Sequence, residues 1–289
     1  MIIKVFAKIN WSLDITGVRP DGYHLLDMVM QPVSICDEIT LASGNSLSIE
    51  TSGFPPSAAN ASNLAYRAAD LLRNQYSVKS GVHISLYKNI PMGAGLGGGS
   101  ADAAGVLYGL NRLWNLHLPL EELESIGLKL GADVPFCLRG GLARTRGIGE
   151  EIENHECKLN YRLLVFQPCK ALSTGEIFSA WHGAEDVRRP NTENVLRALH
   201  DGDASLLSGS IGNVLESVSA ARCPEIPEAI SRLTACGAFA AGMTGSGSAV
   251  FGVFRSGSAA LKAKKILDHI YPRIQICHTQ ADSIRIMEE

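Results

Sequence analysis

The chain contains 289 residues, of which 46% are hydrophobic and 19% are charged. These proportions are typical of a globular protein with one large domain or two ordinary ones, and they exclude a disordered chain. With 26 basic and 29 acidic residues the formal net charge is −3, so no basic excess favours nucleic acid or an anionic membrane as the main partner. An anionic ligand would have to be held locally, by a few lysines or by backbone N–H groups.

The cysteines and the N-terminus narrow the possible classes of protein further. The odd number of cysteines in a long chain, without a Cys-x-x-Cys pair, favours reduced and buried thiols and excludes a paired zinc site. Lys4 and Lys8 interrupt the apolar N-terminus, so we expect no signal peptide, and no apolar run approaches the ~20 residues of a membrane span. We expect a soluble, cytoplasmic protein that acts as a monomer or a homodimer. The seven cysteines are Cys36, Cys137, Cys157, Cys169, Cys223, Cys236 and Cys277.

The first half of the chain is predicted to contain both strands and helices. Residues 1–16 are expected to form a strand, because apolar side chains occupy every second position from Ile3 to Ile9. A helix is expected to begin near Ser62, whose hydroxyl is suited to cap it. The other predicted elements are a turn at 19–22, strands at 28–41, 47–52 and 82–86, a helix at 101–114, and a helix that begins at Pro119 and ends at Gly131.

The second half alternates again between the two kinds of element. Strands and helices mix without a steady βαβ period, which favours an α+β fold over a doubly wound sheet. Composition is less regular from 147 to 160, and we place a domain boundary there, with domains at 1–153 and 154–289. The predicted elements are strands at 161–167, 237–243, 249–254, 273–278 and 283–287, and helices near 174–181, 226–235 and 257–270.

The most informative segment is a glycine-rich loop that leads directly into a helix. Gly93, Gly95, Gly97, Gly98 and Gly99 lack a Cβ, so the backbone can approach a ligand closely and adopt left-handed conformations. The first N–H groups of the following helix are unpaired and lie at its positive end, so the combination predicts a phosphate cradle rather than a flexible surface loop. The context fits neither the dinucleotide motif nor the P-loop pattern GxxxxGK[ST].

Local sequence alone leaves the chemistry of three other segments open. Asp133 stands in an apolar setting, where a lone carboxylate is costly unless it is paired or useful, but it could equally cap the next helical turn. Lys8 is most simply explained as an exposed lysine of a strand. The small residues of 244–248 form either a second close-approach loop or a simple strand-to-strand turn.

Four segments resemble the GHMP kinases (galactokinase, homoserine kinase, mevalonate kinase and phosphomevalonate kinase). PMGAGLGGGSADAA at 91–104 is similar to their phosphate-binding motif, and its triple glycine resembles the diphosphocytidyl-methylerythritol kinases in particular. AKINWSLDITGVRPDGYHLLD at 7–27 is similar to the N-terminal motif of that family, and MTGSGSAVFG at 243–252 to the third superfamily motif. With GADVPFCL at 131–138, the matches run across nearly the whole chain in the expected order.

Two positions depart from the pattern of the resembled family. Ala101 stands where the family usually has a second serine, so a hydroxyl near the phosphate site is lost. Val214 replaces the aspartate of an Asn-Asp-Leu-Glu stretch, which removes one acidic group and is interpreted as a structural change. The first departure removes one candidate contact to Mg²⁺.

The resemblance implies a fold and a reaction. The fold would be the α+β GHMP kinase fold, an N-terminal domain like the second domain of ribosomal protein S5 followed by a ferredoxin-like domain. The reaction would transfer the γ-phosphoryl group of ATP to the 2-hydroxyl of the cytidyl-linked methylerythritol, a step of the non-mevalonate isoprenoid pathway. Another GHMP kinase need not carry Asp21-Gly22-Tyr23-His24, and a non-catalytic nucleotide-binding protein would not need both Lys8 and Asp133.

The resemblance also assigns roles to individual residues. Asp133 would be the catalytic base, paired with the catalytic Lys8. Ser100 would contact phosphate or Mg²⁺, the implied cofactor, for which no ligand set is assigned. The implied nucleotide-binding residues are Asn63, which could instead simply start a helix, and Pro91, Met92, Gly93, Ala94, Gly95, Leu96, Gly97, Gly98, Gly99, Ser100 and Ala101. The implied acceptor-binding residues are Asn10, Tyr23, His24, Thr244, Gly245, Ser246 and Phe178, the last of which could instead be a core residue of a short helix.

Overall fold

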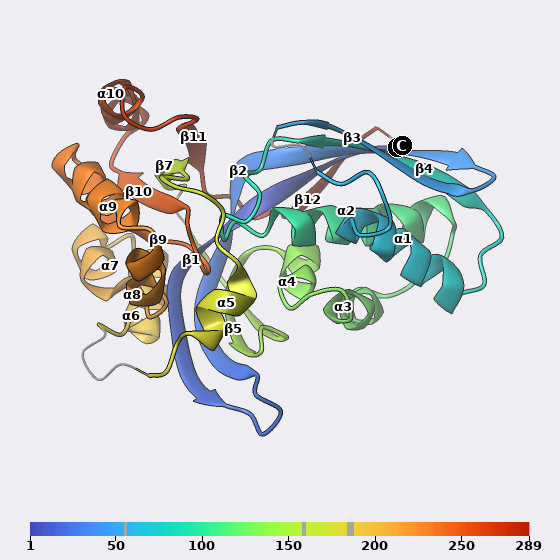
Figure 1. Ribbon diagram of the computed structural model, residues 1–289, viewed down its shortest axis with the longest axis horizontal. Coiled ribbons are helices and arrows are strands. Elements are labelled where there is room, and N and C mark those ends of the chain that lie inside the picture. Colours follow the sequence, from blue (N-terminus) through green and yellow to red (C-terminus); the bar gives the residue numbers. More distant parts are fainter. Residues whose placement is uncertain (55–56, 158–159, 184–187, 289) are drawn as a thin grey trace.

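A long antiparallel β-hairpin is the central element of the fold. The computed structural model describes residues 1–54, 57–157, 160–183 and 188–288. Within these residues, β1 (Ile2–Val18) and β2 (His24–Gly44) are the two longest strands, and their hairpin extends beyond the rest of the sheet (Figure 1). The sheet has the order β12-β1-β2-β4-β3, and β5, β6 and β8 pair beside it. These strands are β3 (Leu47–Gly53), β4 (Gly81–Lys88), β5 (Leu142–Gly147), β6 (Glu151–His155), β8 (Gly212–Asn213) and β12 (Ile284–Glu288).

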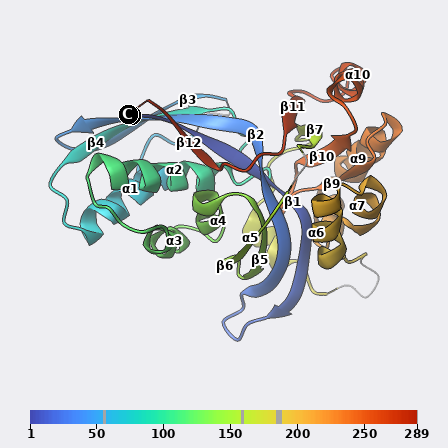
Figure 2. The ribbon, with the colours of Figure 1, turned by 180° about the vertical axis from the view of Figure 1, so that it is seen from behind.

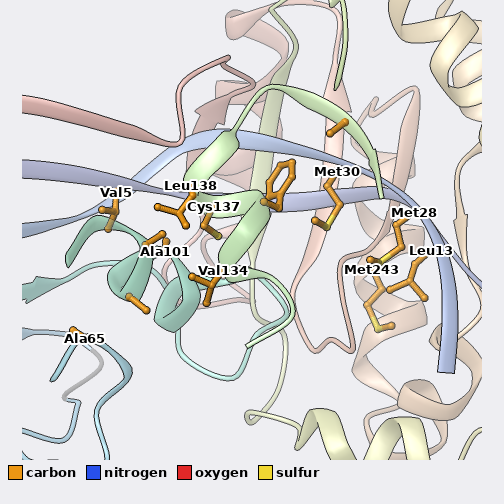
Figure 3. Close-up of a cluster of buried hydrophobic side chains, with 14 of the residues drawn as sticks. Val5, Leu13, Met28, Met30, Ala65, Ala101, Val134, Cys137, Leu138 and Met243 are labelled. Atoms are coloured by element: carbon orange, nitrogen blue, oxygen red, sulfur yellow. The ribbon is translucent and has the colours of Figure 1, made fainter. Parts of the chain in front are cut away.

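Four helices cover one face of this first sheet (Figure 1). They are α1 (Leu64–Gln75), α2 (Gly98–Leu113), α3 (Leu120–Leu128) and α4 (Val134–Arg139). The central helix, α2, buries nine of its 16 residues, because it is rich in alanine and glycine and lies close to the strands. Figure 3 shows Val134, Cys137 and Leu138 of α4 beside Ala101 of α2. This packing fixes α4 and the residues before it against the N-terminal turn of α2.

The second sheet lies beside the middle of the hairpin and carries its own helices (Figure 2). Its strands are antiparallel, in the order β11-β7-β10-β9. They are β7 (Arg162–Phe166), β9 (Ala240–Met243), β10 (Val250–Phe254) and β11 (Gln275–His278). The helices are α5 (Thr174–Ser179), α6 (Thr192–Asp201), α7 (Ala204–Ser210), α8 (Glu216–Arg222), α9 (Glu225–Ala235) and α10 (Gly257–Leu267).

The β1–β2 pairing is irregular where β1 passes between the two halves of the molecule. The register shifts between Phe6 and Lys8 and again between Asn10 and Ser12. Irregularities of this kind re-aim side chains and are common next to active sites. Lys8 and Asn10 are only 4% and 2% exposed, so this segment of β1 is buried on both faces. The prediction of a strand was right, but Lys8 is not the exposed strand lysine of the simplest explanation.

Most predicted elements are present, and the α+β fold class is confirmed. The cap of α1 was predicted wrongly: Asn63, not Ser62, accepts the Ala65 N–H, since Ser62 lies one residue too early. The helix predicted from Pro119 to Gly131 begins at Leu120 and ends at Leu128. The helices α4, α7 and α8 were not predicted, because about two turns or fewer give little periodic signal. The 10-residue helix α6 was missed as well, although it is longer. The domain boundary at 153/154 stays a prediction, and residues 158–159 of that segment lie outside the described residues.

The prediction that the cysteines are reduced is wrong for one pair. Cys169 and Cys223 form a disulfide, with their Cα atoms 6.4 Å apart. The two residues are separated by 54 positions, and only the folded chain brings the segment after β7 next to the end of α8. An odd cysteine count and the absence of close spacings therefore gave no indication of this bond. Across the described ranges, we find no helix with the length and apolarity needed to cross a membrane.

Candidate active site

A cavity of about 740 Å³ lies where the two halves of the molecule meet. Its walls come from β1, from the start of β2, from the glycine-rich loop, from the turn before α4 and from α5. This volume is in the range of ligand sites for small molecules. The cavity brings together ten residues singled out from the sequence: Lys8, Asn10, Tyr23, His24, Gly95, Ser100, Asp133, Phe178, Gly245 and Ser246.

Lys8 and Asp133 form an ion pair in this cavity. The Nζ atom of Lys8 lies 3.4 Å from Oδ2 of Asp133, and it also donates a 2.8 Å hydrogen bond to Oδ1 of Asn10. The side chain of Lys8 is 5% exposed, whereas that of Asp133 is 31% exposed. The ammonium group of Lys8 is therefore buried and held by Asn10, while the carboxylate of Asp133 remains accessible to a molecule in the cavity.

The local fold explains why Asp133 is available. Asp133 is the residue immediately before α4, but its side chain makes no capping hydrogen bond to that helix. Pro135 lies in the first turn of α4, where its missing N–H costs nothing. The buried face of α4 then holds Asp133 at the cavity wall. The side chain of Asp133 therefore does not cap α4.

The glycine-rich loop runs along β1 into the N-terminus of α2. Gly97 precedes the helix with φ = +70°, a left-handed conformation that favours glycine. A Cβ at this position would lie 3.0 Å from Cγ of Lys8. No side chain caps α2, so its first N–H groups stay available to a ligand, as a phosphate cradle requires. Ser100, in the first turn of α2, lines the cavity.

The second small-residue loop lies directly on the first. A Cβ on Gly245 would be 2.7 Å from the carbonyl oxygen of Gly95, so the two backbones are in contact. Asn10 fixes this arrangement: its Oδ1 accepts the Gly245 N–H at 3.0 Å, and its own N–H donates to Oγ1 of Thr244 at 2.9 Å. Residues 244–248 are therefore a close-approach loop, and Asn10 connects this loop to Lys8.

Asn213 shows why the departure at position 214 is structural. Its side-chain amide donates to the carbonyl oxygens of Met243 and Gly245, at 3.2 and 2.8 Å. Its Oδ1 accepts the Leu215 N–H. Val214 is buried in the core, so an apolar residue there is compatible with the fold.

Another part of the cavity wall is aromatic. The rings of His24 and Phe178 lie 5.5 Å apart between centroids, and those of His24 and Trp181 lie 5.7 Å apart in an edge-to-face arrangement. Tyr23 is 60% exposed, and the Arg19 guanidinium lies 6.0 Å from its ring centroid. Phe178 is only partly buried and lines the cavity, so it is not simply a core residue. Trp181 was not predicted, since nothing in the sequence links it to His24.

The remaining predicted residues do not line this cavity, although most belong to the two loops. Ala94, Leu96, Ala101 and Thr244 have buried side chains, so they could meet a ligand only through their backbones. Asn63 caps α1, and its Nδ2 donates to the Ala58 carbonyl oxygen at 2.7 Å. The others outside the lining are Pro91, Met92, Gly93, Gly97, Gly98 and Gly99.

The chain matches two family descriptions that together cover more than half of it. "GHMP kinases N terminal domain" matches residues 63–141, and "GHMP kinases C terminal" matches residues 185–273. The first match contains α1, the glycine-rich loop, α2 and Asp133, so it covers one side of the cavity.

Relatives of similar length agree with this assignment. The chain is 40% identical to a 4-diphosphocytidyl-2-C-methyl-D-erythritol kinase of Alkaliphilus metalliredigens, over 95% of this chain and 94% of that protein. It is 36% identical to the Clostridioides difficile protein of the same name, over 99% and 98% of the two chains.

Solved structures give the same picture. A crystal structure of 4-(cytidine 5'-diphospho)-2C-methyl-D-erythritol kinase matches with a TM-score of 0.83 and 33% identity, covering 97% of this chain and all of that one. A homoserine kinase from Cytophaga hutchinsonii matches with a TM-score of 0.74 at 18% identity, over 99% and 97% of the two chains, which shows the fold alone. The chain therefore belongs to the GHMP kinase family, and within it to the 4-diphosphocytidyl-2-C-methyl-D-erythritol kinases.

Proposed function

We propose that the protein transfers the γ-phosphoryl group of ATP to the 2-hydroxyl of 4-diphosphocytidyl-2-C-methyl-D-erythritol. The products are the 2-phosphate and ADP, and the reaction belongs to the biosynthesis of isoprenoid precursors. The observation that carries this proposal is the Lys8–Asp133 pair, which lines one cavity together with residues of the glycine-rich loop and aromatic side chains. Phosphoryl transfer needs positioning and charge stabilisation more than covalent chemistry, and this arrangement offers both.

The two charged residues have complementary roles. The partly exposed carboxylate of Asp133 accepts the proton of the 2-hydroxyl as its oxygen bonds to the γ-phosphorus and the bond to the ADP oxygen breaks. The ammonium group of Lys8 stabilises negative charge on the phosphoryl group during transfer. Asn10 holds Lys8 through its Oδ1, which keeps the ammonium group beside Asp133.

The glycine-rich loop and the N-terminus of α2 form the nucleotide side of the site. The left-handed conformation of Gly97 and the uncapped first turn of α2 fit a polyphosphate held by backbone N–H groups. Oxygen donors suit Mg²⁺, which proteins hold through one or two carboxylates together with the phosphates of the substrate. The Ser100 hydroxyl lines the cavity in the first turn of α2 and would contact such an ion. The ion would neutralise charge on the phosphates.

The aromatic wall forms the acceptor side. Tyr23 and Phe178 offer faces on which a cytosine ring can stack, and His24, whose ring lies near that of Phe178, offers polar ring atoms. Polar contacts to the edge of the cytosine would add selectivity against acceptors that carry no base. Gly245 and Ser246 complete this side of the cavity near Lys8.

The direct test is ADP release measured with a panel of acceptors. The purified protein is incubated with ATP and, separately, with the cytidyl compound, homoserine, mevalonate or galactose, and ADP is followed by a coupled assay. We expect ADP formation only with the cytidyl compound. ADP formation with mevalonate but not with the cytidyl compound would overturn the substrate while leaving the kinase family intact.

Replacing Tyr23 by Ala is expected to raise KM for the acceptor about tenfold or more, because a base-stacking contact is worth roughly 1–3 kcal/mol. KM for ATP should not change, since Tyr23 belongs to the turn between β1 and β2 and not to the glycine-rich loop. Steady-state kinetics with both substrates measure the two constants. Tyr87→Ala is the matched control, because this tyrosine is similarly exposed, at 56% against 60%, and lies away from the cavity. An acceptor KM equal to that of the control would remove Tyr23 from the site.

Replacing Gly97 by Ala is expected to weaken ATP binding by roughly tenfold, because the left-handed conformation costs about 1–2 kcal/mol for a residue with a Cβ. The new methyl group would also press on the side chain of Lys8, so kcat should fall as well. Nucleotide affinity by calorimetry, kcat and the melting temperature are measured together. Gly257→Ala is the control, because a Cβ there meets nothing within 4 Å at the start of α10. A fall in melting temperature without loss of affinity would make the loop a purely structural turn.

A further inference from the structure

His24 lines the cavity, but its ring nitrogens have no partner among the described residues. The ring is contacted by Phe178, with centroids 5.5 Å apart, and by Trp181, with centroids 5.7 Å apart. Neither ring nitrogen makes a hydrogen bond or an ion pair within the same described ranges. The nitrogens are therefore available to a ligand, and it is the packing of the ring that fixes the direction in which they point.

The two aromatic neighbours of His24 differ in their relation to the cavity. Phe178 lines it, whereas Trp181 does not. The ring of Trp181 meets that of His24 edge to face, with an interplanar angle of 81°, which is one of the arrangements that aromatic pairs favour. Trp181 is therefore placed to influence a ligand through His24 and not by touching it.

The short helix α5 holds Trp181 in this position. At its start, the hydroxyls of Thr174 and Ser246 form a 2.9 Å hydrogen bond, and the fully buried Ile177 anchors the helix in the core. Immediately after the helix, the Trp181 N–H donates to the carbonyl oxygen of Phe178 at 3.1 Å. The indole packs against the core, and its own N–H is buried without a hydrogen-bond partner in the described part of the chain. Apolar packing therefore places the Trp181 ring.

We propose that Trp181 is a positioning residue for the acceptor, whose ring fixes the orientation of His24 toward the polar edge of the cytosine. Cytosine carries an amino group where uracil carries a carbonyl oxygen, so the two bases need different partners there. The two nitrogens of a neutral imidazole are one donor and one acceptor, so a fixed ring can distinguish the bases, whereas a ring that turns freely can pair with either. This inference rests on the proposed function and adds the residue that sets the selectivity of its acceptor side.

The experiment compares the wild type, Trp181→Leu and Trp181→Phe in steady-state kinetics with the cytidyl compound and with its uridyl analogue. Leucine retains apolar bulk without a ring, whereas phenylalanine retains a ring and loses no hydrogen bond, because the indole N–H makes none within the described residues. For Trp181→Leu we expect KM for the cytidyl compound to rise about three- to tenfold, equivalent to the loss of one aromatic pair. Its kcat and its KM for ATP should stay within about twofold, since only binding of the acceptor is affected.

The choice of base gives a second readout that a merely structural role would not move. The preference of the wild type for the cytidyl over the uridyl compound, measured as the ratio of the two kcat/KM values, should fall in Trp181→Leu by about the same three- to tenfold factor. Trp181→Phe should restore most of this preference and most of the acceptor affinity, because it returns a ring to the contact with His24.

Trp114→Leu is the matched control. Trp114 is also partly buried against the core, its indole N–H is likewise buried and unpaired within the described ranges, and it does not line the cavity. Both acceptor constants should stay at their wild-type values. A double-mutant cycle then tests the route of the effect: in a His24→Ala background, Trp181→Leu should add no further rise in acceptor KM, because residues that act through one another are not additive.

A wild type that accepts both bases equally contradicts the inference without any variant. A folded Trp181→Leu protein with the wild-type KM for the cytidyl compound contradicts it as well, and so does a loss that Trp181→Phe does not restore or that is equally large in the His24→Ala background. Circular dichroism and melting temperature establish folding, and Trp181→Met replaces Trp181→Leu if the latter does not fold. If the wild type does not phosphorylate the cytidyl compound, the proposed function and this inference fail together, whereas turnover with an unchanged KM in Trp181→Leu refutes the inference alone.

Discussion

Asp133→Asn is expected to lower kcat by about 10²–10⁴, the usual contribution of a general base. The amide keeps the shape of the carboxyl group but cannot accept the proton of the hydroxyl, and it removes the charge that faces Lys8. KM for the acceptor should change little, because contacts made in the ground state largely persist. A loose, metaphosphate-like transition state would need less help from a base, and Asp133 would then mainly orient the hydroxyl.

Single-turnover phosphorylation distinguishes these roles, because it removes product release from the measured rate. If Asp133 is the base, Asp133→Asn and Asp133→Ala should be similarly slow. If it orients the hydroxyl, Asp133→Asn should be clearly faster than Asp133→Ala, since the amide can still form a hydrogen bond. A folded Asp133→Asn protein with a near-normal single-turnover rate would exclude Asp133 from the chemistry.

The parts of the site that the sequence predicts are those with local causes. The glycine-rich loop is recognisable because the glycines and the following apolar helix are contiguous, and the geometry of Gly97 agrees with that interpretation. Asp133 stands out because an apolar segment surrounds it. The burial of Lys8 could not be predicted from its strand alone, because it depends on contacts with other segments. The register of the β1–β2 pairing shifts beside Lys8, and the carbonyl oxygen of Leu96 in the glycine-rich loop accepts the Lys8 N–H.

The parts that escaped prediction depend on contacts between distant segments. Trp181 meets His24 across more than 150 positions, and Lys88 meets Asp37 across 51. In the sequence, Lys88 ends an apparently ordinary alternating strand, and Asp102 is one polar residue in a small-residue helix. Only the packing of α2 against the sheet buries the two together. The same reason explains the disulfide between Cys169 and Cys223, whose positions carry no local signal.

Lys8→Met is expected to lower kcat by about 10²–10³, comparable to the loss of one preorganised group that stabilises charge in a transition state. Methionine is nearly as long as lysine and suits the buried stem, so the change mainly removes the ammonium group. The variant also leaves Oδ1 of Asn10 without its charged donor, although Gly245 still donates to that atom. Affinity for the ATP analogue should fall less than kcat, because the charge is needed most when the phosphoryl group is in transit.

A double-mutant cycle tests whether Lys8 and Asp133 act as one unit. If each group is useful only beside the other, Lys8→Met/Asp133→Asn should be little slower than the poorer single variant, because the effects of such residues are strongly non-additive. The pair Lys264–Asp268 provides a matched cycle, since it is an ion pair of the same chemistry on the exposed side of α10. Lys264→Met, Asp268→Asn and their combination should leave kcat unchanged. If the fold-losses in kcat of the two single variants multiply in the double variant, the two residues contribute independently. The ion pair between them would then not be needed for catalysis.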